Sequence, residues 1–312
     1  MPAPDTRRTP LGRLAALVAC VFCAAAWPAP ARAQDHHADQ ISLAFNDPEA
    51  WALNYFTSAT LLSGLETPRA RTPWSITFGA EVEWIPAISP GNRYVGMGGT
   101  KQEDLNKTPV YLRPRFTIGL PRKFSVIVAF DPPLRAFGIK PALLALAVER
   151  PVYESEPWTV GLRVYGQVGN VNGAYTCPSE VLAFTPGSPG NLYGCTAESS
   201  DTASLRYLGS EVSLSHDGLG HWKISPHIAF GVNYFNTAFQ VHAPTFGFID
   251  HTLYTAHGFT VSGDLGVSYR ISDRLEMSVD SLYTPLWINR TDTGRHFLPF
   301  YNVRALFSYR IK

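Results

Sequence analysis

Charged side chains recur at every second position in several stretches of this chain, a spacing that could bring them together. The rows contain Glu81, Glu83, Arg113, Arg115, Glu149, Arg163, Asp264, Arg270, Glu276, Asp280, Arg304 and Arg310, and Tyr165 and Gln167 share the row of Arg163. Acidic and basic residues are equal in number, whereas a strongly ion-selective pore lines its constriction with one sign. Facing a common space, these charges could form either an internal salt-bridge network or a narrow polar channel.

Motifs of common catalytic and metal sites are missing from the sequence. It contains no HExxH pair, glycine-rich phosphate loop or zinc-type cysteine pair. His242, His251, His257 and His296 fall near predicted loops and could converge there, but loop histidines are more often solvated. We therefore expect no catalytic site, no metal and no cofactor.

Cys177 and Cys195 lie in one polar segment, residues 170–203, that is rich in glycine, proline and serine. Two cysteines in such a segment favour a loop-closing disulfide, provided that the protein reaches an oxidising compartment. A metal site built from two cysteines alone is the weaker alternative.

The start of the chain indicates that compartment. Residues 1–33 read as a secretory signal peptide, with Arg7, Arg8 and Arg13 before an apolar run and a small-residue cleavage site at 31–33. A lipoprotein signal ending at Cys20 is a weaker alternative. No later stretch has 18 or more consecutive apolar residues, so any insertion into a membrane must use strands. The net charge of +1 gives no indication of nucleic-acid binding.

Strict alternation of apolar and polar residues predicts strands along most of the mature chain. In residues 257–283, Phe259, Val261, Leu265 and Val267 alternate with polar side chains on either side of a short polar break, which predicts a long hairpin. Similar alternation predicts further strands at 75–85, 110–120, 124–130, 142–148, 159–168, 205–214, 224–236 and 301–311.

The predicted connections alternate in length along the chain. Short ones fall at 67–73, 121–123, 150–157, 217–221 and 272–274, and generally longer ones fall at 86–109, 131–141, 170–203, 241–256 and 289–299. Short turns on one side and longer loops on the other are typical of an outer-membrane barrel. A soluble Greek-key sandwich has no reason to sort its loops in this way.

Aromatic residues open the strands that follow the short turns. Trp74, Phe124, Trp158 and Trp222 all occupy this position. An amphipathic ring is most stable at the membrane–water interface, so the pattern predicts an aromatic girdle on the periplasmic side.

With its signal sequence, alternating strands, sorted loops and aromatic strand starts, the chain resembles the porin-like class of bacterial outer-membrane β-barrels. The resemblance implies an all-β fold, an antiparallel up-and-down transmembrane β-barrel over residues 51–312, located in the outer membrane. We expect twelve strands, with ten strands plus an N-terminal plug or helix in residues 34–50 as the alternative. The chain ends on Lys312, whereas such barrels commonly end on an aromatic residue.

The resemblance and the balanced charge predict a narrow porin-like channel or passive transporter of small polar solutes, or of an amphipathic solute that enters laterally. The alternative is a closed barrel with a structural role or with long loops that bind an extracellular ligand. An outer-membrane hydrolase is the third possibility, although the chain lacks the His-x-Ser-Asn-Gly motif of outer-membrane phospholipases. The expected partners are membrane lipid, lipopolysaccharide and the outer-membrane assembly machinery.

Overall fold

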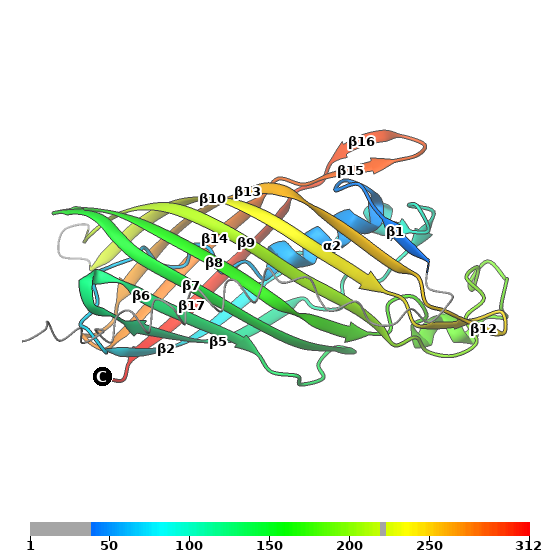
Figure 1. Ribbon diagram of the computed structural model, residues 1–312, viewed down its shortest axis with the longest axis horizontal. Coiled ribbons are helices and arrows are strands. Elements are labelled where there is room, and N and C mark those ends of the chain that lie inside the picture. The colour runs from blue at the N-terminus through cyan, green and yellow to red at the C-terminus, as the bar shows by residue number, and fades with distance from the viewer. Residues whose placement is uncertain (1–38, 219–222) are drawn as a thin grey trace, which may run out of the picture. The chain divides into compact units, whose positions relative to one another are not determined.

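Ten antiparallel strands form a closed barrel in the computed structural model, which describes residues 39–218 and 223–312 (Figure 1). The predicted signal peptide 1–33 and Trp222 lie outside the described residues. The strands are β2 (Ile76–Trp84), β5 (Val110–Gly119), β6 (Ser125–Asp131), β7 (Ile139–Ser155), β8 (Trp158–Gly173), β9 (Asp201–His216), β10 (Ile224–Gln240), β13 (Leu253–Arg270), β14 (Leu275–Thr284) and β17 (Phe300–Arg310). Each pairs with its neighbours in the chain, and β17 pairs with β2 to close the ring.

The connections between barrel strands confirm the predicted alternation of short turns and long loops, whereas the predicted short connection at 67–73 lies in the segment before β2 and joins no pair of barrel strands. One rim carries tight turns such as 120–124, 156–157 and 271–274, and the other carries the long loops 85–109, 174–200, 241–252 and 285–299. The long loops contain the short strand pairs β3 (Tyr94–Gly96) with β4 (Lys101–Gln102), β11 (Ala243–Thr245) with β12 (Phe248–Asp250), and β15 (Trp287–Arg290) with β16 (Gly294–Phe297). The long-loop rim is the outer end of such a barrel and the short-turn rim is the periplasmic end.

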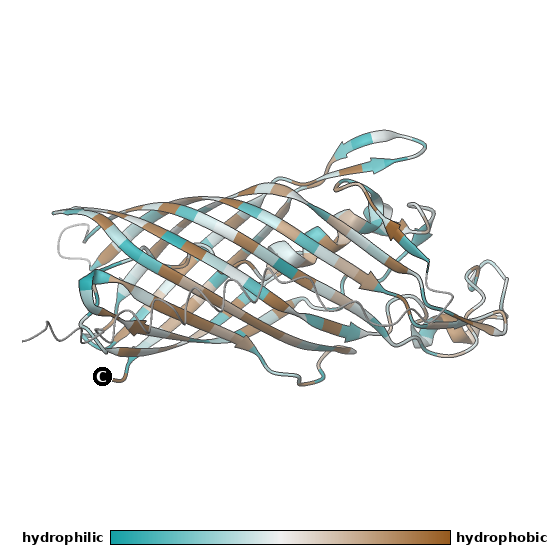
Figure 2. Cartoon of the chain, in the orientation of Figure 1, coloured by the Kyte–Doolittle hydropathy of each residue, from teal (hydrophilic) through white to brown (hydrophobic). Residues whose placement is uncertain are grey.

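The outward face of the barrel is apolar. Large exposed apolar side chains recur on every strand of the ring, among them Phe78, Phe116, Leu144, Leu162, Leu208, Phe230, Leu265, Tyr283 and Phe307. Apolar and polar residues alternate along the strands (Figure 2). Trp74 and Trp158 are exposed at the periplasmic end, where the girdle was predicted. Such a belt is matched to acyl chains rather than to water. Among the described residues, no helix is long and apolar enough to cross a membrane.

The segment before the barrel enters the lumen instead of adding two strands. β1 (Gln40–Ser42) pairs in parallel with Leu253–Thr255 of β13 at the outer rim, beyond the point where β14 leaves that edge free. The helix α2 (Pro48–Ala59) follows, and residues 60–74 then run to the periplasmic rim, where the Trp74 N–H donates to the Gly119 carbonyl. The preferred count of twelve strands is therefore corrected to the ten-strand alternative with an N-terminal plug.

We call residues 39–74 the plug, and its extent corrects the predicted boundaries. The plug was predicted at 34–50 and the barrel at 51–312, whereas the first barrel strand begins only at Ile76. Pro48 at the first helical position and Glu49 in the first turn favour a helix start after Asp47. Most of α2 is buried around its whole circumference, because the helix is enclosed by the strands (Figure 1).

Candidate functional site

The outer half of the lumen is filled by apolar packing between the plug and the barrel wall. Trp51, Tyr55, Leu61 and Leu62 of the plug are buried, and they belong to one cluster with inward side chains of the strands. The wall contributes the small residues Ala129, Ala145 and Ala147 together with Tyr165, Tyr207, Phe235, Leu282 and Phe300. The small residues leave room for the side chains of the plug.

Below the helix, three buried arginines of the wall hold the extended part of the plug by its backbone. Arg113 donates to the Thr60 carbonyl at 2.8 Å, and Arg304 donates to the Leu61 carbonyl at 3.1 Å. Arg163 donates to the carbonyls of Gly64 and Glu66, each at 2.8 Å. We call residues 60–66 the clamped segment.

Buried carboxylates of the wall complete the clamp. Glu211 accepts a hydrogen bond from the Gly64 N–H at 2.8 Å, and Asp280 accepts one from the Leu65 N–H at 2.6 Å. Gly64 has a φ of +58°, and a Cβ at this position would lie 2.5 Å from carboxylate oxygens of both Asp264 and Asp280. Only glycine combines this backbone conformation with so close an approach.

The same wall residues form buried ion pairs with one another, and Arg163 and Arg304 each bind two carboxylates. Arg113 binds Glu81 at 3.0 Å, Arg163 binds Glu149 at 2.9 Å and Glu211 at 3.1 Å, and Arg304 binds Asp280 at 2.9 Å and Asp264 at 2.5 Å. Each of these residues has an exposed fraction of 3 % or less. A buried charge is tolerated only when it is paired and hydrogen-bonded, and here the plug backbone supplies the remaining partners.

Most residues predicted to line the lumen therefore line a filled lumen. Glu81, Glu83, Arg113, Arg115, Glu149, Arg163, Tyr165, Gln167, Asp264, Asp280 and Arg304 are all buried inside the barrel. Gln167 donates to the Thr60 hydroxyl at 2.8 Å. Glu276 is half-buried and binds Arg69 of the plug at 3.3 Å.

Arg310 corrects the prediction, because it is exposed at the periplasmic end of its strand and does not line the packed lumen. Arg270 is also exposed at that end, but it lines a polar cavity there together with Glu276. Sequence analysis also missed Glu211 and Tyr207, whose hydroxyl donates to the Thr60 carbonyl at 2.7 Å. Both occupy the inward phase of β9, so extending the alternation through residues 205–214 would have found them.

The ring of strands is open on one side near its outer rim. The ladder between β5 and β6 runs only from Gly119↔Ser125 to Arg115↔Ala129, so residues 110–114 have no partner in β6. β6 ends at Asp131, whereas the next strand, β7, begins at Ile139 and pairs there with β8. Pro114, Pro132 and Pro133 occupy this edge, and proline cannot donate to a ladder. We call the gap between 110–114 and 139–142 the seam.

A cavity of about 420 Å³ passes through the seam. Its inner walls are α2 and the lumen side of β7 and β9, including Leu53, Phe56 and Leu205. The same cavity is lined by Leu112 and Leu134, which are 63 % and 69 % exposed on the outer surface. The cavity, here called the seam pocket, is thus lined both by interior residues beside the plug helix and by residues exposed on the outer surface.

A second cavity, of about 470 Å³, lies at the periplasmic end and is lined mainly by polar side chains such as Arg69, Thr159, Ser225 and Ser268. We call this second cavity the periplasmic vestibule. Thr60 lines the seam pocket and Arg69 lines the vestibule, so the clamped segment lies between the two along the chain.

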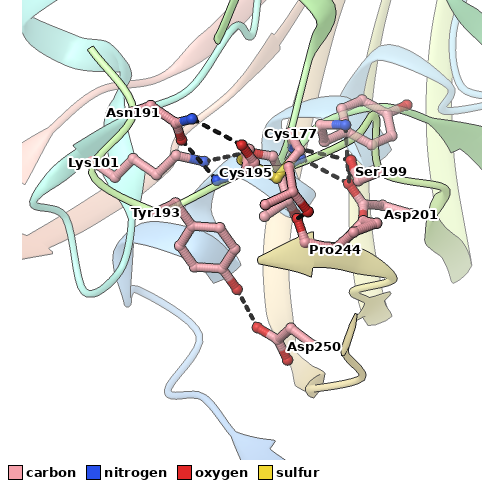
Figure 3. The surroundings of a disulfide bond; sticks show 12 residues. Lys101, Cys177, Asn191, Tyr193, Cys195, Ser199, Asp201, Pro244 and Asp250 are labelled. Atoms are coloured by element: carbon pink, nitrogen blue, oxygen red, sulfur yellow. Dashed lines mark hydrogen bonds between the residues drawn. A yellow bond between two sulfur atoms is a disulfide. The ribbon is translucent and has the colours of Figure 1, made fainter. Parts of the chain in front are cut away.

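The outer loops are tied together above the seam pocket. The predicted disulfide between Cys177 and Cys195 is confirmed, with the two Cα atoms 5.6 Å apart (Figure 3). Asp201 is fully buried beside it and accepts hydrogen bonds from the Ser199 hydroxyl at 2.7 Å and the N–H groups of Thr176 and His242. These contacts join loop 174–200 to loop 241–252, which reduces the freedom of both.

Lys101 connects the third outer loop, 85–109, to this assembly. Its ammonium donates to the Thr176 carbonyl at 2.7 Å and lies 2.9 Å from Glu103. It also lies 5.1 Å from the centre of the Tyr193 ring, and Figure 3 shows both residues. Burial raises the pKa of Glu103 to about 7, although the Lys101 ammonium opposes this shift. Lys101, Glu103 and Tyr193 all line the seam pocket.

The raised pKa predicts that loop 85–109 packs more firmly in acid. In the packed loop Glu103 keeps its proton up to about pH 7, whereas a free glutamate loses it near pH 4.5. The packed state of the loop therefore loses stability as pH rises from 4.5 to 7. We expect proteolysis within this loop to be about tenfold faster at pH 8 than at pH 5, after correction for the protease with a free peptide. Glu103→Gln should remove the dependence, and an unchanged ratio in that variant would contradict the assignment to Glu103.

Of the four loop histidines, His242 and His251 approach each other, with ring centroids 4.8 Å apart. His257 lies beside Tyr234 and His296 bonds to Thr293. Among residues 39–218 and 223–312, no group of three or more His, Cys, Asp or Glu side chains could hold a metal ion.

Comparisons with known proteins extend only to the fold. No protein-family model matches the chain, and no curated protein matches it. The outer-membrane protease OmpT of Escherichia coli is a similar solved structure, with 8 % identity and a TM-score of 0.39 over 76 % of this chain and 94 % of that chain. The toluene transporter TodX of Pseudomonas putida has 10 % identity and a TM-score of 0.29 over 77 % and 90 %.

The attachment invasion locus protein Ail of Yersinia pestis has 10 % identity and a TM-score of 0.27 over 77 % of this chain and 99 % of that chain. All three are outer-membrane proteins of different activity, so the likeness carries no function. The closed ring, the apolar belt and the sorted loops of the chain itself are those of a bacterial outer-membrane β-barrel located in the outer membrane.

Proposed function

We propose that the protein admits small, mainly apolar or amphipathic molecules from the membrane into the seam pocket, and that its lumen is not a standing channel for polar solutes. The observation that carries this proposal is the shared lining of the pocket. Side chains that face lipid, such as Leu112, and side chains that face the lumen, such as Leu205, line the same cavity. An apolar molecule can therefore move from acyl chains to the interior without crossing water.

The clamped segment supports the choice of lateral entry over vertical passage. A polar solute travelling along the barrel axis would have to displace residues 60–66, which are held by arginines and carboxylates of the wall. Most of the balanced charges are engaged in buried ion pairs, whereas Arg270 and Arg310 are exposed at the periplasmic end. Onward transfer to the periplasmic vestibule then requires movement of the plug.

Photolabelling tests the proposal directly. Purified barrel in lipid bilayers is irradiated with a small aryl diazirine, and labelled peptides are mapped by mass spectrometry. We expect label on interior residues of α2 and β9 that line the pocket, such as Leu53 and Leu205, which surrounding lipid cannot reach. Label confined to outward residues such as Leu112 would contradict entry.

A matched pair of variants separates the pocket from the membrane. Ala203 lines the pocket, so Ala203→Trp should lower interior labelling about tenfold by filling it. Ala305→Trp adds the same volume on β17, away from the pocket, and should leave interior labelling unchanged. Equal labelling of both variants would show that the probe does not occupy the seam pocket. No covalent step is involved, and hydrolysis of lipid by the purified barrel would favour the hydrolase alternative.

A further inference from the structure

We propose that the seam pocket selects molecules that combine an apolar body with a hydrogen-bond donor, a hydroxyl, phenol or amine, and that Asp131 binds this donor. This inference rests on the proposed function, because it names the chemical class that the pocket takes. Asp131 is the last residue of β6, lines the pocket and is 2 % exposed. A carboxylate at the end of a strand beside an apolar cavity needs an explanation.

One oxygen of this carboxylate is engaged and the other is free. The Tyr111 hydroxyl of β5 donates to Oδ2 of Asp131 at the end of β6. Oδ1 is buried and has no hydrogen-bond partner among the described residues. The tyrosine therefore fixes the orientation of the carboxylate, and Oδ1 remains an unused acceptor of a residue that lines the pocket.

Nearby cations do not take up this acceptor. The Arg113 guanidinium lies 5.6 Å from the Tyr111 ring, and it is directed to Glu81 and the Thr60 carbonyl. The Lys101 ammonium is bound to Glu103 and the Thr176 carbonyl. Lys107, which also lines the pocket, lies 3.7 Å from Asp104. The Tyr193 hydroxyl, also on the pocket lining, donates to Asp250.

Leaving an acceptor unpaired in an apolar cavity costs free energy. A ligand that donates to it therefore gains more binding free energy than the same hydrogen bond would contribute in water. Hydrogen bonds to a carboxylate are also stronger than neutral ones. A ligand with only acceptor atoms gains nothing at Oδ1, and an anionic ligand such as a fatty acid is repelled. The pocket should therefore discriminate by the donor and not by the apolar body.

Three naphthalene probes of nearly equal size test this selectivity by competition with the interior photolabel. We expect 1-naphthol, which has a donor, to compete at least about tenfold better than 1-methoxynaphthalene, which has only an acceptor. Anionic 1-naphthoate should compete least. Equal competition by naphthol and methoxynaphthalene would overturn the role of Asp131 while leaving the pocket itself intact, whereas failure of all interior labelling would overturn the proposed function.

Substitution at Asp131 provides the sharper readout. In Asp131→Asn the amide oxygen can still accept from Tyr111, which turns the amide N–H toward the pocket, so the preference should reverse in favour of 1-methoxynaphthalene. In Tyr111→Phe the carboxylate remains, and the preference for naphthol should persist. An unchanged preference in Asp131→Asn would overturn the inference. Heat-modifiable gel migration of each variant verifies that the barrel is folded.

Discussion

Deleting residues 39–66 should convert a barrel that passes almost no ions into one with reproducible single-channel conductance. The deleted part carries the apolar packing of Trp51, Leu61 and Leu62 and the clamped segment, which together fill the lumen. Eight-stranded barrels are filled by their own side chains and those of 16 to 18 strands hold a wide channel, so ten strands with small inward alanines leave a narrow passage. The measurement is current through planar bilayers, with the complete chain as reference.

Glycine substitutions test the same point without removing the plug. Gly64→Ala places a Cβ against Asp264 and Asp280 at a positive φ, so it should loosen the clamp and produce brief openings. Gly263→Ala is the matched control, because a Cβ there meets nothing within 4 Å. Steady conductance of the complete chain would show that the plug does not seal the lumen. Silence of a deletion variant that still shows heat-modifiable migration would show that the wall seals it alone.

Arg163→Ala should lower the free energy of unfolding by about 3–5 kcal/mol, the cost of breaking a buried ion pair. The substitution leaves Glu149 and Glu211 without their shared cation and removes the donors to the carbonyls of Gly64 and Glu66. Urea unfolding of the barrel in lipid bilayers, followed by tryptophan fluorescence and gel migration, measures the loss.

Two comparisons show whether the loss comes from uncompensated charge. The triple variant Arg163→Met, Glu149→Gln, Glu211→Gln removes the charges together and should recover a large part of the stability. Arg270→Ala, at the exposed periplasmic rim, should change stability by no more than about 0.5 kcal/mol. If Arg163→Ala were as mild as Arg270→Ala, the clamp would contribute little to the folded barrel.

The barrel wall was predictable from sequence because a strand with one face toward lipid and the other toward the lumen alternates apolar and polar residues. Arg163, Tyr165 and Gln167 show this, since their shared face follows from spacing alone and all three are buried inside the ring. Loop length and the position of Cys177 and Cys195 are also local properties. Arg270 and Arg310 share the inward phase, but spacing cannot say how far a strand projects beyond the packed interior.

The plug and the seam depend on contacts that no local pattern records. α2 is buried on all sides, so it lacks the one-sided stripe that identifies a surface helix. Residues 60–66 satisfy their backbone through side chains about 50 to 240 positions away, as Arg113 and Arg304 show. Pro114 was visible in the sequence, but its effect on the ladder follows only from the register of β5 against β6.

The pairing of β17 with β2 closes the barrel around the plug, a segment that precedes β2 in the same chain. The barrel and the plug inside it therefore cannot be assembled in arbitrary order. Either the plug already lies across the unclosed sheet when β17 pairs with β2, or it must be threaded lengthwise through the lumen of the closed barrel. A bulky cargo joined ahead of Asp39 obstructs the second route and leaves the first open, so topology alone couples the order of assembly to what precedes the plug.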